Sequence, residues 1–244
     1  MAIRLHNGDC LAEMKHLEDS SIDLILSDPP YGVNFQNCNY NDTWEYVMEN
    51  MSEWYCEWFR LLKEDCYLVL FTGVKNIDKW ISKGEEVGFT FKNIIATRAF
   101  NNGVKHPDNN FGFQFQPVLL FSKGKGCKFN KVDFIPTSKE WFNDKRNKNP
   151  KPYTYQYPNW INTTWAFATA KRASKNFHPN EKNVDFVKFL VQVLSGEGAL
   201  VLDPFMGSGT TGIAAQRLNR DFIGMEIDKQ YFNIAQERIN GVFV

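Results

Sequence analysis

Short apolar runs of strand length alternate with stretches of helical periodicity along most of this chain. The run Ile22–Asp28 (IDLILSD) is typical of a buried strand, whereas Thr43–Leu62 places apolar and aromatic side chains at helical spacing, as a helix facing a core does. This alternation predicts a doubly wound α/β fold, a mostly parallel sheet with helices on both faces. The expected strands are Ile3–Asp9, Ile22–Asp28, Tyr67–Thr72, Asn93–Phe100, Pro117–Ser122, Ala199–Phe205 and Asp221–Ile227; the expected helices are Cys10–Leu17, Thr43–Leu62, Asn183–Leu194, Gly209–Leu218 and Lys229–Ile239.

A glycine-rich turn follows one of the last expected strands, in the sequence VLDPFMGSGTT. Gly207 and Gly209 carry no Cβ, so a ligand can approach the backbone closely. Glu226 closes the next expected strand, where a carboxylate can accept hydrogen bonds from a ribose diol. The turn therefore predicts an adenosine-type cofactor, but NAD and S-adenosylmethionine both fit it, because Gly207, Gly209 and Gly212 also satisfy the dinucleotide spacing GxGxxG.

The tetrapeptide Asp28-Pro29-Pro30-Tyr31 ends another expected strand, at the edge of the sheet where ligands bind in such folds. The two prolines fix the backbone and remove two N–H donors, which leaves the Asp28 carboxylate and the Pro30 carbonyl as acceptors beside an aromatic ring. An exocyclic amine on a flat base suits this cluster. Acceptors on its N–H groups stabilise the positive charge that develops as the nitrogen takes a methyl group, and Tyr31 can stack on the base.

These two motifs resemble those of the amino-methylating DNA methyltransferases, whose catalytic loop is (Asp/Asn/Ser)-Pro-Pro-(Tyr/Phe/Trp) and whose cofactor loop is Phe-x-Gly-x-Gly. The catalytic motif precedes Phe205-Met206-Gly207-Ser208-Gly209 here, which looks like the permuted beta group with its target-recognition region between the motifs. The resemblance implies a Rossmann-like methyltransferase fold. It divides the chain into a catalytic half (1–122), a target-recognition insertion (123–177) and a cofactor-binding half (178–244).

The resemblance extends to two further segments. Gly8-Asp9-Cys10 is similar to the family's loop beside the cofactor adenine, where Asp9 would accept from the amino group. The segment 178–182 (HPNEK) resembles the family's His-Pro-Thr-Gln-Lys-Pro segment but departs from it at positions 180, 181 and 183; Lys182 would pair with the cofactor's carboxylate. The resemblance thus implies S-adenosylmethionine as cofactor, held by Asp9, Cys10, Asp28, Lys182, Asp203, Phe205, Gly207, Ser208, Gly209, Thr210 and Glu226.

Aspartate rather than serine at position 28 resembles the members that methylate adenine N6, so the expected reaction is methylation of an extruded adenine by Asp28, Pro29, Pro30 and Tyr31. Cytosine N4, an RNA base and a protein amide remain alternative acceptors. An NAD-dependent oxidoreductase would leave the tetrapeptide unexplained, and a non-catalytic DNA-binding protein would not need Asp28, Tyr31 and Glu226.

One stretch between the two motifs carries a net positive charge. Residues 123–182 hold 13 Lys or Arg against four Asp or Glu, a net charge of +9 in a chain whose formal net charge is zero. Basic residues interleaved with aromatics suit a nucleic acid, so double-stranded DNA is the expected partner. The residues expected to contact phosphates are Lys145, Arg146, Lys148, Lys151, Lys171, Arg172 and Lys175.

Composition excludes several other classes. The five cysteines are scattered without a CxxC pair and the four histidines form no metal motif, so neither a disulfide framework nor a metal centre is expected. No apolar window has the length of a membrane span, and the N-terminus does not resemble a signal peptide, which predicts a cytoplasmic protein. The family resemblance also allows a homodimer, with the Thr43–Leu62 helix as a candidate surface.

Overall fold

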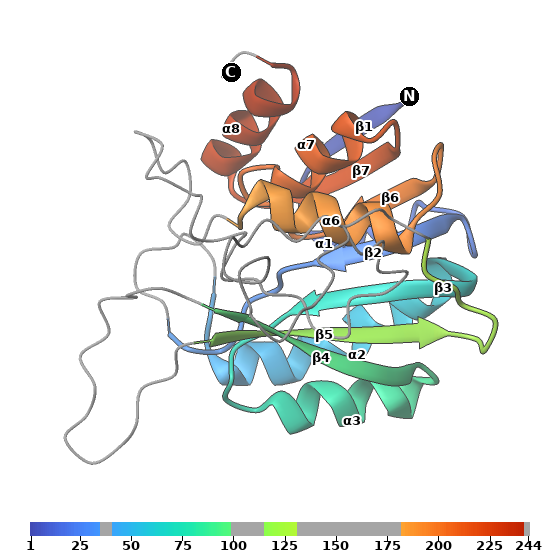
Figure 1. Ribbon diagram of the computed structural model, residues 1–244. Coiled ribbons are helices and arrows are strands. Elements are labelled where there is room, and N and C mark those ends of the chain that lie inside the picture. The colour runs from blue at the N-terminus through green and yellow to red at the C-terminus, as the bar shows by residue number, and fades with distance from the viewer. Residues whose placement is uncertain (35–40, 99–114, 131–181, 242–244) are drawn as a thin grey trace, which may run out of the picture.

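The computed structural model describes residues 1–34, 41–98, 115–130 and 182–241, and these ranges form one sheet between two layers of helices (Figure 1). The sheet has seven strands in the order β1-β7-β6-β2-β3-β5-β4. The strands are β1 (Ile3–Asn7), β2 (Ile22–Ser27), β3 (Leu62–Phe71), β4 (Thr90–Arg98), β5 (Phe115–Lys123), β6 (Leu200–Asp203) and β7 (Asp221–Glu226). The helices are α1 (Cys10–Met14), α2 (Trp44–Leu61), α3 (Ile77–Val87), α6 (Val184–Leu194), α7 (Thr210–Arg217) and α8 (Lys229–Ile239).

The predicted doubly wound α/β class is confirmed. Four adjacent pairings, β1–β7, β7–β6, β6–β2 and β2–β3, are parallel, and only β5 runs antiparallel to its neighbours β3 and β4. Each predicted strand and helix is present, with shifts at the ends. The largest shift is at β3, which begins at Leu62 rather than Tyr67, because the polar residues Lys63, Glu64 and Asp65 continue the strand without an apolar pattern.

Two apolar cores lie on opposite faces of the sheet, because successive strand residues point to opposite sides. Leu24 and Leu26 of β2 join the core under α6, α7 and α8. Ile25 joins the core under α1, α2 and α3, where Trp54 of α2 is buried, and an irregularity in the register between Ile22 and Leu24 places Ile22 in that core too. The aromatic stripe of α2 therefore faces the chain's own core, as its periodicity predicted, and is not available as a dimer surface.

Helix α3 was not predicted from the sequence, although Ile77, Trp80 and Ile81 follow a helical period. Gly84 interrupts this short segment, and glycine is unfavourable inside a helix. The structure gives the reason for glycine there. A Cβ at position 84 would stand 2.8 Å from the ring of Phe121, so its absence lets α3 pack closely on the sheet.

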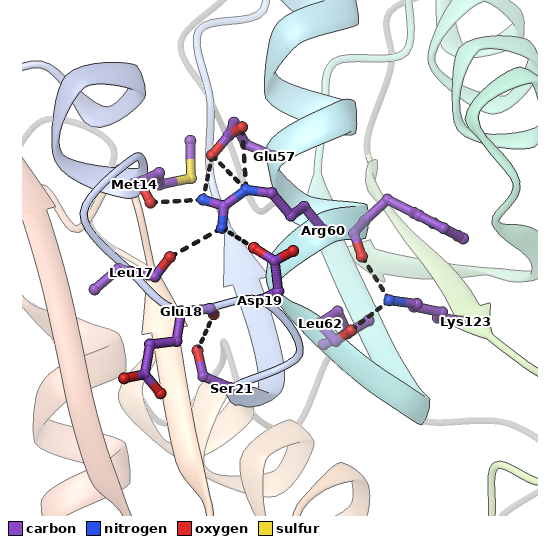
Figure 2. A network of polar contacts seen from close by, with 10 residues as sticks. Met14, Leu17, Glu18, Asp19, Ser21, Glu57, Arg60, Leu62 and Lys123 are labelled. Atoms are coloured by element: carbon purple, nitrogen blue, oxygen red, sulfur yellow. Dashed lines mark hydrogen bonds and ion pairs between the residues drawn. The ribbon is translucent and has the colours of Figure 1, made fainter.

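Arg60, near the end of α2, joins that helix to the connection between α1 and β2 (Figure 2). Its guanidinium donates to the backbone carbonyl oxygens of Leu17 and Met14 at 2.9 and 2.8 Å, and it forms ion pairs with Asp19 and Glu57. Charge-assisted hydrogen bonds to several acceptors in fixed positions hold the chain as it enters β2. This strand ends at the candidate site.

The order in which the chain adds strands reverses between β6 and β2. From β6 the chain continues outward to β7, and from β2 it continues outward to β3 on the other side. The register pairs Leu24 with Val201 and Ile25 with Leu202 in parallel, so Asp28, just after β2, and Asp203, the last residue of β6, lie at the same edge. Ligands bind at such switch points in open α/β sheets, beyond the carboxyl ends of the strands.

Candidate active site

A cavity of about 480 Å³ opens at this switch point, a volume suited to a nucleoside-sized ligand. Its walls come from the segments that follow β1, β2, β6 and β7, together with Phe71 at the end of β3 and Lys182 before α6. The sheet thus brings together residues that the sequence separates by more than two hundred positions. Those expected from the sequence are Asp9, Cys10, Asp28, Pro29, Pro30, Tyr31, Lys182, Asp203, Phe205, Gly207, Ser208, Thr210 and Glu226.

Asp28 contacts two of these residues through different oxygens. The Tyr31 hydroxyl donates a short hydrogen bond to Oδ1, and the Lys182 ammonium lies 2.6 Å from Oδ2. The Lys182 side chain is 12% exposed and that of Asp28 is 24% exposed, so the ion pair is largely shielded from water. In this structure Lys182 therefore contacts the catalytic motif itself, in addition to lining the cavity expected to hold the cofactor.

The turn after Pro30 is anchored by Asp42, which sequence reasoning did not identify. Its Oδ1 accepts hydrogen bonds from the backbone N–H groups of Tyr31 and Gly32, each at 2.8 Å. Gly32 has φ +71°, and a Cβ there would stand 2.7 Å from Trp44, so only glycine fits this turn. Asp42 is buried and lines the cavity. It closes the loop 34–42, within which residues 35–40 lie outside the described residues.

The glycine-rich turn is tied to the end of β7. Glu226 accepts from the backbone N–H of Gly207 at 3.0 Å and from that of Asp228 at 2.8 Å. Gly209 does not line the cavity in the described part of the chain; its φ is +83°, and a Cβ would stand 3.0 Å from Ala235 of α8. Glycine at 209 thus serves the left-handed backbone and the packing of α8, while Gly207 faces the cavity.

Asp203, the last residue of β6, is buried beside the glycine-rich turn and lines the cavity. Its oxygens accept from the Thr211 hydroxyl at 2.6 Å and from the Phe205 N–H at 3.1 Å. The pKa of Asp203 is raised to about 7: burial is the largest cause, the nearby carboxylates of Asp28 and Glu226 add to it, and the two hydrogen bonds partly offset it. Burial likewise raises the pKa of Glu226.

Asp9 and Cys10 occupy the start of α1. The Asp9 side chain caps the helix by accepting from the Ala12 N–H at 3.0 Å. Cys10 is buried, and burial together with the Asp9 carboxylate raises the pKa of its thiol, so it stays protonated and is no nucleophile at neutral pH.

The electrostatic character of the cavity suits a cationic cofactor. Five acidic residues line it, and among the described lining residues Lys182 is the only basic one. A sulfonium bears a positive charge and a ribose offers two hydroxyl donors, both of which favour carboxylates. The acidic lining of the cavity therefore fits S-adenosylmethionine. The acidic lining residues are Asp9, Asp28, Asp42, Asp203 and Glu226.

The remaining site predictions concern residues outside the described part of the chain. All seven basic residues expected to contact phosphates fall within 131–181, so the DNA-contact prediction and the insertion boundaries stay predictions. Residues 124–130 are described, and they pack against the body: the Asn130 N–H donates to the Val193 carbonyl oxygen of α6 at 2.8 Å. Within the described ranges no cluster of three or more His, Cys, Asp or Glu could hold a metal ion, and no described helix is long and apolar enough to cross a membrane.

Comparisons with known proteins agree with the fold and the cavity. The sequence model of the DNA methylase family, N6_N4_Mtase, matches residues 22–237. The chain is 31% identical to the type II methyltransferase M.HpaI of Haemophilus parainfluenzae over 98% of this chain and 75% of that protein. It is 29% identical to the DNA adenine methyltransferase YhdJ of Escherichia coli K12 over 96% of this chain and 81% of that protein.

This chain also resembles a solved structure of a methyltransferase complex in its fold. The complex of M1.HpyAVI with S-adenosylmethionine superimposes with a TM-score of 0.66 at 26% identity, covering 98% of this chain and 99% of that chain. The fold and the acid-lined cavity define a Rossmann-like methyltransferase that uses S-adenosylmethionine. This chain belongs to the N6_N4_Mtase family of DNA methylases, and its substrate class is an amino group of a DNA base.

Proposed function

We propose that the protein transfers a methyl group from S-adenosylmethionine to the exocyclic N6 amino group of an adenine in DNA. The observation that carries this proposal is the placement of the Asp28 carboxylate. It stands at the switch point in the same cavity as the acidic groups suited to the cofactor, and Tyr31 and Lys182 hold it from two sides.

Asp28 is the acceptor for the target amine. A carboxylate has about four lone-pair sites on its two oxygens, so after binding Tyr31 and Lys182 it can still accept an N–H. The Pro30 carbonyl offers a second acceptor, and the Tyr31 ring offers a stacking surface. Together they hold the amine with its lone pair directed at the methyl donor and stabilise the charge that develops on nitrogen.

The residues that would hold the cofactor are those of the acid-lined wall. Glu226 would accept from the ribose hydroxyls, because its two existing bonds to backbone N–H groups leave lone pairs available. Asp9, at the start of α1, would accept from the cofactor's adenine amino group. When bound, S-adenosylmethionine supplies an electrophilic methyl group on a sulfonium. No covalent intermediate with the protein is required.

Adenine is preferred over cytosine as the target for two reasons. Aspartate at position 28 resembles the adenine-N6 type of the motif, and one relative, YhdJ, is a DNA adenine methyltransferase. Methylation of cytosine N4 is the second candidate, since the family's name covers both reactions and both bases present an exocyclic amine.

The basic stretch 123–177 is proposed to bind double-stranded DNA, with Lys145, Arg146, Lys148, Lys151, Lys171, Arg172 and Lys175 on its phosphates. The target base has to leave the helix, because a stacked amine cannot reach a methyl donor bound inside the cavity. Extrusion costs a few kcal/mol, which phosphate contacts and stacking on Tyr31 would offset.

Mass analysis of nucleosides tests the proposal. The purified protein is incubated with labelled S-adenosylmethionine and unmethylated DNA or RNA of matched sequence, and the product is digested to nucleosides. N6-methyladenine in DNA is the expected result. N4-methylcytosine would overturn the base assignment, and methyl transfer to RNA alone would overturn the DNA assignment.

A further inference from the structure

Gln116 contacts the catalytic tetrapeptide although it lies outside every motif of the sequence. It stands near the start of β5, which is antiparallel to its neighbours, and its side-chain Nε2 donates to the Tyr31 hydroxyl at 2.5 Å. Gln116 is not among the described residues that line the cavity, so it contacts Tyr31 from outside the cavity. We propose that Gln116 is a positioning residue that fixes the Tyr31 hydroxyl as a donor to Asp28; this inference rests on the proposed function.

The direction of the Tyr31 hydroxyl follows from counting its hydrogen-bonding capacity. A phenolic oxygen has one proton and two lone pairs. Gln116 donates to the oxygen, and the Lys182 ammonium approaches it at 3.4 Å as a second donor. The Asp28 carboxylate accepts hydrogen bonds and cannot donate one, so the hydroxyl proton points to its Oδ1.

The backbone around Gln116 is suited to this task because it is held by both neighbouring strands. Thr97 of β4 pairs with Gln116, and its hydroxyl donates to the Gln116 carbonyl oxygen at 2.8 Å. On the other side, the Thr72 N–H after β3 donates to the Pro117 carbonyl oxygen at 3.1 Å. A site built on paired strands is held more precisely than one built on a loop.

The consequence for Asp28 is a carboxylate whose orientation is set before the substrate arrives. Tyr31 holds one oxygen and Lys182 holds the other, so the remaining lone pairs have a fixed direction. An acceptor that is already oriented contributes to the rate of the transfer step rather than to binding of the cofactor. Loss of Gln116 should therefore lower the single-turnover rate and leave the affinity for S-adenosylmethionine unchanged.

The test is a double-mutant cycle between Gln116 and Tyr31, read by single-turnover methyl transfer to DNA. Gln116→Leu should lower the rate roughly threefold to tenfold, the effect of one hydrogen bond, with the Kd for S-adenosylmethionine within about twofold of wild type. In a Tyr31→Phe background the same change should cost less than about twofold, because the hydroxyl it acts on is absent. Gln116→Glu should be slower than Gln116→Leu, because a carboxylate can accept the hydroxyl proton and draw it from Asp28.

The controls separate this inference from the proposed function. Gln192→Leu removes an exposed amide on α6 and should keep the wild-type rate. An unchanged rate for Gln116→Leu, or an equal loss with and without the Tyr31 hydroxyl, would overturn the inference alone, provided that Asp28→Ala is inactive. A fully active Asp28→Ala, or no transfer to DNA by the wild-type protein, would overturn the proposed function and this inference with it.

Discussion

The Lys182 ammonium lies 2.6 Å from Oδ2 of Asp28, so a residue of the second half of the chain neutralises the carboxylate of the first-half motif. The two residues are 154 positions apart, and the sheet alone brings them together. The pair is largely shielded from water, and removing one partner of a shielded pair leaves the other charge without compensation.

Lys182→Met should therefore lower kcat/KM for methyl transfer by about tenfold to a hundredfold, with partial solvent access limiting the loss. The matched control is Lys79→Met, because Lys79 pairs with Asp78 on the surface of α3 and both side chains are more than half exposed. Steady-state kinetics with varied S-adenosylmethionine measures both variants. If Lys182→Met keeps its activity within twofold of wild type, the ion pair has no role in the reaction.

Asp42 should be required for the shape of the catalytic turn. Asp42→Ala removes the acceptor of the Tyr31 and Gly32 N–H groups, and two buried charge-assisted hydrogen bonds are lost. We expect a single-turnover rate lowered more than about tenfold and a stability loss of about 1–3 kcal/mol. Asp42→Asn keeps one carbonyl oxygen, so its rate and its stability should lie between those of the wild-type protein and of Asp42→Ala. Wild-type rate and stability in Asp42→Ala would show that the turn is held by other contacts.

The raised pKa of Asp203 predicts that the stability of the folded protein depends on pH. Its pKa is about 7 in the folded protein and near 3.8 when exposed in the unfolded chain, so the folded state binds more protons between these values. Its contribution to stability is therefore present at low pH and is lost as the pH rises from about 4 to about 7. Asp203→Asn keeps the shape and one of the two acceptor oxygens, and it should remove this loss, about 4 kcal/mol over the full range.

The Asp203 prediction is checked by urea unfolding of both proteins between pH 5 and pH 8. The unfolding free energy of the variant, minus that of the wild type, should increase as the pH rises. Comparing the two proteins at each pH removes the contribution of other titrating groups, such as Glu226. A difference that is constant with pH would mean that Asp203 does not titrate in this range.

Arg60 should matter for stability and not for catalysis, since it lies at the far end of β2 from the cavity. Arg60→Met should lower the unfolding free energy by about 2 kcal/mol, because it leaves backbone carbonyls and carboxylates without their donor. For a chain of this size the Tm should fall by roughly 4–8 °C. Calorimetry measures the shift, with Lys79→Met as a control expected to stay within about 0.5 kcal/mol. An unchanged Tm would mean that α1 and α2 do not depend on this contact.

Much of the fold was accessible from the sequence because local signals and tertiary structure agree. Thr43, Asn183 and Asp228 each cap a helix, and helix α8 begins and ends where its pattern indicated. Where the local signal was weak, prediction was poorer, as for the polar start of β3 and for α3 with Gly84 in its last turn.

The site was predictable in its motifs and less so in its supporting contacts. Asp28, Tyr31 and Glu226 stand at strand ends and carry recognisable chemistry. Asp42 and Gln116 resemble ordinary polar residues in the sequence, and their roles depend on which backbone and side-chain groups distant segments place beside them. Such contacts follow from packing, which one sequence does not encode in any local pattern.

Asp28→Ala tests the central claim most directly, when methyl transfer to DNA and binding of S-adenosylmethionine are both measured on the same preparation. The account predicts no detectable N6-methyladenine from the variant and a cofactor Kd close to that of the wild-type protein, because Asp28 holds the target amine. A variant that still methylates adenine at the wild-type rate would contradict the assignment of Asp28 as the group that receives the amine.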